Sequence, residues 1–103
     1  PTSSIQALHK LSGRLPLERE GAFRSWARHD LEVAQAVREV DLARMDHLGR
    51  LLEGQGYPPT EARAIAWLEY AALLGMAQLH DSITDDERRH AYRYLERGLH
   101  HER

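Results

Sequence analysis

Apolar residues recur at spacings of three and four along most of the chain, which is the pattern of helices with one buried face. Nowhere do β-branched and aromatic residues alternate as they do in a half-buried strand. Glycine, proline and short polar residues divide the pattern into five helical segments, which are expected to begin after Ser3 or Ser4, at Leu15, after Asp30, after Thr60 and after Thr84. We therefore predict an all-α fold, an antiparallel bundle of about five helices in which residues 1–103 form one domain.

Specific capping signals mark three of these helix starts. Asp30 is a good N-cap for a long helix over residues 31–54, and Thr60 is the expected N-cap of the helix that follows. Thr84 and Glu87 form a Thr-x-x-Glu capping box at the start of the last helix. Along the long helix one stripe is expected to be buried, made of Val33, Val37, Val40, Leu48 and Leu51.

The segment 64–79, AIAWLEYAALLGMAQL, is apolar almost all the way round, and only Glu69 and Gln78 are polar. A helix without a polar face must be covered on two sides or lie in a membrane. A membrane span needs roughly 20 apolar residues, and this run is shorter and contains a glutamate. A second protein surface is therefore the expected cover.

The two sides of this apolar helix differ in the size of their residues. Its bulky side carries Ala66, Trp67, Tyr70, Leu73, Leu74 and Ala77, which suits a core or a cavity. Its small side allows a neighbouring helix to come close, and the last helix offers a matching apolar face. A two-fold copy of this helix pair would complete a four-helix bundle, so we predict a homodimer. The predicted interface comprises Ala64, Leu68, Ala71, Ala72, Gly75, Leu79, Ala91, Leu95, Gly98 and Leu99.

Composition excludes several functional classes. Fourteen Lys and Arg against sixteen Asp and Glu give a formal net charge of −2, so the chain lacks the basic surface that binds DNA or an anionic membrane. It has no cysteine, which excludes disulfides and thiolate zinc sites and is compatible with a reducing compartment. No secretory signal fits the first residues, and a cytoplasmic location is expected. The start at Pro1 suggests a chain cut from a longer one.

Neither a metal site nor an active site is expected. No two of the seven histidines have the three- or four-residue spacing of helical metal ligands, and His100 with His101 is expected to form a solvated end. No nucleophile and base arrangement or glycine-rich phosphate loop is present. We therefore predict a protein that is not an enzyme and needs no cofactor.

Two stretches, WARHDLEVAQAVREVDLARMDHLGRLL and PPTEARAIAWLEYAALLG, carry a family resemblance. With the glycine-rich break between them, they resemble the C-terminal effector-binding and dimerisation domain of TetR-type transcriptional repressors. Many relatives have a proline where this sequence has Leu31. The resemblance implies a homodimer with a central four-helix bundle, a small-molecule pocket among the other helices, and a DNA-reading N-terminal helix-turn-helix that this chain does not contain.

The candidate ligand-binding residues are Trp26, Val37, Asp41, Arg44, Leu48, Trp67, Tyr70 and Leu74. Arg44 falls inside the apolar stripe, and a buried charge needs a partner, for which Asp41 one turn back is the obvious choice. This pair is either structural or part of a ligand site. Glu69 is expected either to reach solvent at the dimer edge or to pair with an arginine.

Two functions remain open at this stage. One is the ligand-sensing domain of a TetR-type repressor, which binds a small hydrophobic or amphipathic effector and acts on DNA only through the missing N-terminal domain. The other is a stand-alone helical module that binds a different protein through the same apolar helix.

Overall fold

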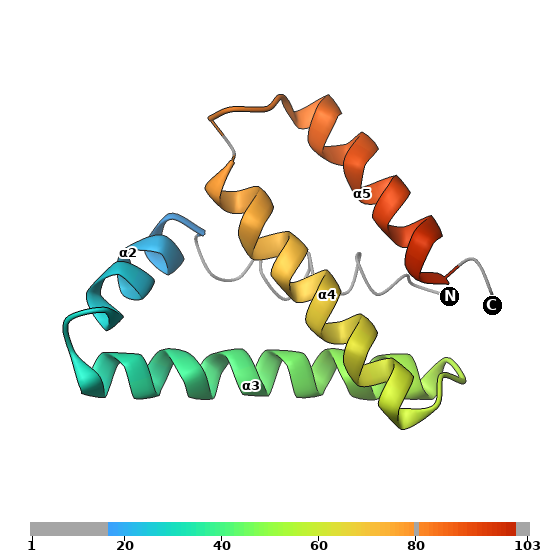
Figure 1. Ribbon diagram of the computed structural model, residues 1–103, viewed down its shortest axis with the longest axis horizontal. Helices are drawn as coiled ribbons and strands as arrows, with labels where there is room; N and C mark the ends of the chain where they lie inside the picture. The colour runs from blue at the N-terminus through green and yellow to red at the C-terminus, as the bar shows by residue number, and fades with distance from the viewer. Residues whose placement is uncertain (1–16, 80, 101–103) are drawn as a thin grey trace.

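The computed structural model describes residues 17–79 and 81–100, and this part of the chain is all helix and turn without a strand. Four helices follow one another: α2 (Leu17–Ala27), α3 (Leu31–Gly54), α4 (Pro59–Gln78) and α5 (Asp85–His100) (Figure 1). The predicted all-α fold is thus confirmed. The predicted helix that begins after Ser3 or Ser4 lies outside the described residues.

The long helix α3 is the base on which the other helices are arranged (Figure 1). Helix α4 crosses the C-terminal half of α3 and makes its most extensive contacts there, while α2 packs against α3 as well. Helix α5 returns beside α4 in the opposite direction and touches it less extensively than α3 does. Helices α4 and α5 are therefore antiparallel, as predicted for neighbouring helices of the bundle.

Two of the predicted N-caps are confirmed. The Oδ1 atom of Asp30 accepts hydrogen bonds from the backbone N–H groups of Glu32 at 2.9 Å and Val33 at 3.2 Å. The backbone N–H of Thr84 donates to the Glu87 side chain at 2.8 Å, and the N–H of Glu87 donates to the Thr84 hydroxyl at 3.1 Å. Both devices satisfy backbone donors that a helix start leaves without an intrahelical partner.

The start of α4 differs from the prediction. The helix begins at Pro59, its N-cap is Pro58, and Thr60 lies inside the first turn, so Thr60 is not the cap. Proline is favoured at the first helical position because its fixed φ suits the helix and its missing N–H would have had no partner there. Gly56 precedes these prolines with a φ of 104°, which a residue with a side chain rarely adopts, and it turns the chain from α3 into α4.

The core lies where α3, α4 and α5 meet. Its buried apolar members are Leu48, Leu52, Tyr57, Ala62, Ile65, Ala66, Tyr70, Leu73 and Tyr92. Leu95 and Leu99 of α5 pack against this cluster from outside. None of the described helices is both long and apolar enough to cross a membrane.

The buried face of α3 is rotated from the predicted stripe. Leu48 is buried as expected, but Val40 and Leu51 are substantially exposed, and Leu52 and Gly49 are buried in their place. Helix α4 packs on the flank of α3 that bears Leu52, and the turn at Tyr57 closes over it. The spacing identified a helix with a buried face but placed the centre of that face too far towards Leu51.

Candidate functional site

A polar cluster joins α2, α3 and α4 beside the core. Its hub is the hydroxyl of Tyr70, which donates to Oδ1 of Asp41 at 2.7 Å and accepts from Nη1 of Arg44 at 2.9 Å. Arg24 of α2 forms a two-pronged ion pair with Asp41, one contact of which measures 3.1 Å, and also approaches the Tyr70 oxygen at 3.4 Å. We call these four residues the Tyr70 cluster.

Electrostatics fix the protonation states within the Tyr70 cluster. Burial by itself raises the pKa of Asp41, but the hydrogen bonds from Arg24 and Tyr70 and the charges of Arg24 and Arg44 outweigh it, so the pKa lies below its usual value. Burial, followed by the hydrogen bond to Asp41, raises the pKa of Tyr70 to about 12, although Arg44 opposes the shift. At neutral pH the cluster therefore holds a carboxylate and a neutral phenol.

The structure brings together only part of the predicted ligand-binding set. Asp41, Arg44 and Tyr70 meet in the Tyr70 cluster, whereas Trp26 and Trp67 are 54% and 51% exposed. The three remaining candidates are apolar, one buried and two partly buried: Leu48, Val37 and Leu74. In this arrangement the Tyr70 hydroxyl bonds directly to both Asp41 and Arg44.

Arg24 is a member of the cluster that sequence reasoning did not identify. It pairs with Asp41 across seventeen positions, and the predicted Asp41 partner, Arg44, reaches Asp41 through the hydroxyl of Tyr70. The sequence places Asp41 only as the partner of the buried Arg44, and it does not predict which side of α2 faces Asp41. Spacing along one helix could not have supplied this information.

The exposed side of α4 coincides with the side assigned to a dimer interface. Leu68 is 54% exposed, and Leu79 is exposed too. Ala72 is partly buried at the margin of this surface. The rest of the surface is made of small exposed residues, which are Ala64, Ala71 and Gly75. Trp67 borders it, with Arg63 stacked over its ring at 5.4 Å. We call this surface the α4 face.

The predicted interface residues of α5 are divided between the core and the surface. Leu95 and Leu99 are partly buried against the core cluster, and Ala91 is partly buried as well. Gly98 is exposed, and a Cβ atom built on it would meet no atom within 4 Å. On this helix the apolar face thus serves the chain's own core and leaves a narrower strip for a partner.

A second polar cluster ties the end of α5 to the core. Glu69 of α4 is fully buried, so the expectation that it reaches solvent was wrong. Its Oε1 atom lies 2.7 Å from Nε2 of His100, and Nδ1 of His100 contacts the hydroxyl of Tyr57. The sequence predicted that His100 belongs to a solvated end of the chain. That prediction was wrong, because the His100 side chain contacts Glu69 and Tyr57.

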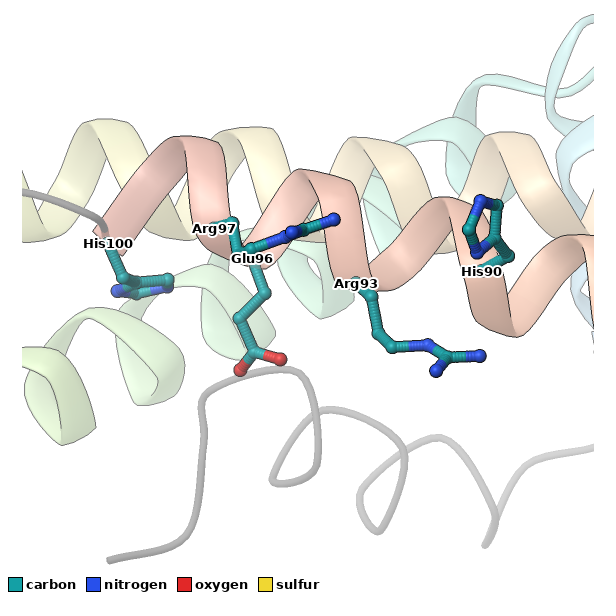
Figure 2. Close-up of a pocket in the computed structure, with 5 residues that line it drawn as sticks. All are labelled: His90, Arg93, Glu96, Arg97 and His100. Atoms are coloured by element: carbon teal, nitrogen blue, oxygen red, sulfur yellow. The ribbon is translucent and has the colours of Figure 1, made fainter.

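A hollow of about 620 Å³ opens along α5. Figure 2 shows the side chains that line it. Among the described residues, the side chains that line it come from α5 and carry both charges: His90, Arg93, Glu96, Arg97 and His100. Tyr94 lies beside it, with Arg97 over its ring at 4.6 Å and the His90 ring in edge contact at 5.1 Å. None of the predicted ligand-binding residues lines this hollow.

Within residues 17–79 and 81–100, no group of three or more metal-ligating side chains comes together. The chemistry available at the Tyr70 cluster is hydrogen bonding and ion pairing from two guanidinium groups, one phenol and one carboxylate, bordered by apolar residues. No family model, curated protein or solved structure matches this chain.

Proposed function

We propose that this chain is a ligand-sensing and dimerisation domain of the kind found in TetR-type repressors, in which α4 and α5 of two copies form a four-helix bundle. The α4 face is the observation that supports the proposal most strongly. It exposes two leucines together with the small residues Ala64, Ala71 and Gly75 on one side of the helix. Large exposed apolar surfaces on small domains mark interaction sites.

A second copy of the chain suits the α4 face better than a polar or charged partner. Small side chains allow the backbones of two helices to approach closely, and a two-fold axis brings identical patches together. Trp67 and Leu68 are large exposed anchors at its border, the kind of residue that carries much of the binding energy at interfaces. A stable obligate dimer typically buries on the order of 2,000 Å² in total, so the proposed interface includes α5 as well as α4.

The sensing half of the proposal concerns the Tyr70 cluster. It links three helices by polar contacts, so a small molecule that competes for one of these contacts would change how α2 lies on α3 and α4. The apolar residues around it, Leu48 and Leu74 among them, favour an effector that is hydrophobic or amphipathic. In the full-length repressor, movement of α2 would be passed to the DNA-reading segment.

Sedimentation equilibrium of the chain with Gly75→Arg tests the dimer. A Cβ atom at Gly75 would meet nothing within 4 Å, so the substitution leaves the single chain intact and acts only on a surface that a partner covers. We expect the unmodified chain to be a dimer at micromolar concentration and Gly75→Arg to be a folded monomer, because an unpaired charge in an apolar interface is costly. Gly54→Arg, at an equally open position at the end of α3, is the matched control and should stay dimeric.

Two results would overturn the proposal. A folded monomer in the unmodified chain would leave the α4 face to another protein and favour the stand-alone interaction module. A dimer that tolerates Gly75→Arg as well as it tolerates Gly54→Arg would place the interface elsewhere on the molecule.

A further inference from the structure

The contact between Glu69, His100 and Tyr57 joins three parts of the fold that are distant in sequence. Glu69 lies in the middle of α4, Tyr57 in the turn between α3 and α4, and His100 is the last residue of α5. We propose that these residues form a clasp that holds α5 on α4, so that its opening releases α5 and with it the proposed dimer interface.

Both ring nitrogens of His100 have a partner. An ionised Glu69 side chain can only accept, so Nε2 of His100 donates to it across 2.7 Å. The Tyr57 hydroxyl can donate to Nδ1 of the neutral ring or accept from Nδ1 of the protonated ring, so this contact serves both forms of His100. The edge-on packing of the Tyr57 and His100 rings at 5.4 Å orients the His100 ring.

The burial of Glu69 makes this residue depend on its contact with His100. The Glu69 side chain has no exposed surface, and a carboxylate in such a place depends strongly on each hydrogen-bond donor that it has. The His100 side chain is only 19% exposed, and it lies at the wall of the hollow in Figure 2, from which solvent or a small solute can reach it. A group at the surface thus controls the environment of a fully buried charge.

Within the part of the chain that the structure describes, the other contacts of α5 with the fold are modest. Its contact with α4 is less extensive than the contact between α3 and α4. Tyr92 is the buried residue that it adds to the core, while Leu95 and Leu99 are partly buried. Residues 79–84, of which residue 80 is outside the described part of the chain, connect α4 to the N-terminal end of α5. Tyr92 therefore secures the first half of α5, and the clasp secures the second.

The link from clasp to dimer rests on the proposed function, whereas the clasp itself does not. If α5 supplies part of the interface through Leu95 and Gly98, a loosened α5 no longer presents that part in a fixed position. Opening the clasp and separating the subunits would then be coupled equilibria. Any solute that draws His100 away from Glu69 through the hollow would favour the monomer.

The test compares His100→Asn with His90→Asn, a matched change at an exposed histidine on the same helix. The asparagine side chain reaches about as far as the Nδ1 atom, so it can still meet Tyr57 but not Glu69. Amide hydrogen exchange followed along the chain at neutral pH reports the opening of each helix. We expect His100→Asn to speed exchange about tenfold or more from Tyr92 to Gly98, with little change in α3, and His90→Asn to leave both unaltered.

Tyr57→Phe is the milder second variant, because it keeps the ring contact and deletes only the hydroxyl. It should loosen α5 in the same region to a smaller degree, and Tyr94→Phe, at an exposed tyrosine, is its control. This variant decides the question should His100→Asn fail to fold.

Three outcomes would count against the clasp. Exchange in α5 that matches the unmodified chain would show that the contact holds nothing, faster exchange confined to the last turn would show mere fraying, and equal acceleration of α3, α4 and α5 would show general destabilisation. Sedimentation of the same variants tests the coupling separately. A loosened α5 with unchanged dimer affinity overturns the coupling and leaves the clasp standing. A monomeric unmodified chain overturns the proposed dimer and the coupling together, and the exchange experiment still decides the clasp.

Discussion

The hydroxyl of Tyr70 lies 2.7 Å from a carboxylate oxygen of Asp41 and joins the centre of α4 to the centre of α3. The same oxygen accepts from Arg44, so one phenol bridges an aspartate and an arginine that lie one turn apart on α3. Because these groups are buried or partly buried, each depends on the others for its hydrogen bonds.

Tyr70→Phe should destabilise the fold by about 1–3 kcal/mol, because it keeps the buried ring but removes one partner each from Asp41 and Arg44. Tyr94→Phe deletes a hydroxyl from an exposed ring and should change stability by less than about 0.5 kcal/mol. Urea unfolding followed by circular dichroism measures both. Equal stability of the two variants would show that the Tyr70 cluster contributes little to the fold.

Acid should lower the free energy of unfolding, because Asp41 becomes protonated. The pKa of Asp41 is lowered in the folded state from 3.8, so the unfolded chain takes up the proton more readily. The stability that Asp41 contributes is therefore complete above about pH 5 and is lost as the pH falls through the folded value. Asp41→Asn should flatten this part of the curve of unfolding free energy against pH.

The control for the acid experiment is Asp46→Asn, which removes an exposed carboxylate paired with Arg50 on the same helix. An exposed pair of this kind typically contributes less than about 1 kcal/mol. If Asp46→Asn flattened the curve as much as Asp41→Asn, the acid sensitivity would come from the general charge of α3.

Leu52→Ala and Leu51→Ala test the orientation of α3 with two neighbouring residues of the same type. Leu52 is fully buried and Leu51 is 37% exposed, so the first change should cost about 2–5 kcal/mol and the second about 1 kcal/mol or less. Urea unfolding at neutral pH again gives the comparison. A larger loss of stability in Leu51→Ala than in Leu52→Ala would favour the buried stripe that the sequence predicted, with Leu51 facing the core.

An effector should raise the melting temperature of the chain. Small hydrophobic or amphipathic compounds screened by thermal shift are expected to include stabilisers, because a ligand that binds only the folded state stabilises it by mass action. Tyr70→Phe, which removes the central hydroxyl of the Tyr70 cluster, should reduce the response, and Tyr94→Phe, at an exposed ring on α5, should not. Hits that respond equally to both substitutions would place the binding site away from the Tyr70 cluster.

Local signals allowed most of the fold to be predicted. Asp30 and the pair Thr84 and Glu87 mark helix starts through bonds that span two or three residues, so their geometry is already contained in the sequence. The start of α4 was misplaced because Thr60 was preferred over a proline that fits the first helical position equally well. The periodicity of α3 identified a helix, but the choice between Leu51 and Leu52 depends on where α4 lies.

Contacts between distant segments account for what was missed at the candidate site. Arg24 meets Asp41 over seventeen positions and His100 meets Glu69 over thirty-one, and neither pair shares a helix. Arg44 was correctly placed in the interior because its position on the α3 helix requires it. Its hydrogen-bond partner, Tyr70, lies on another helix, and nothing in the spacing of either helix indicates that the two meet.

The exposure of Trp26 and Trp67 gives this chain an intrinsic optical probe of its surroundings. Trp26 stacks on Phe23 with ring centroids 6.2 Å apart, and Trp67 lies at the edge of the α4 face, so neither indole reports directly on the core. An indole in contact with water emits at longer wavelength than one covered by protein. The emission wavelength of the folded chain therefore depends on what covers its surface. For the proposed dimer, we expect a dilution series read by fluorescence to show a shift to longer wavelength as the subunits separate, without loss of helix.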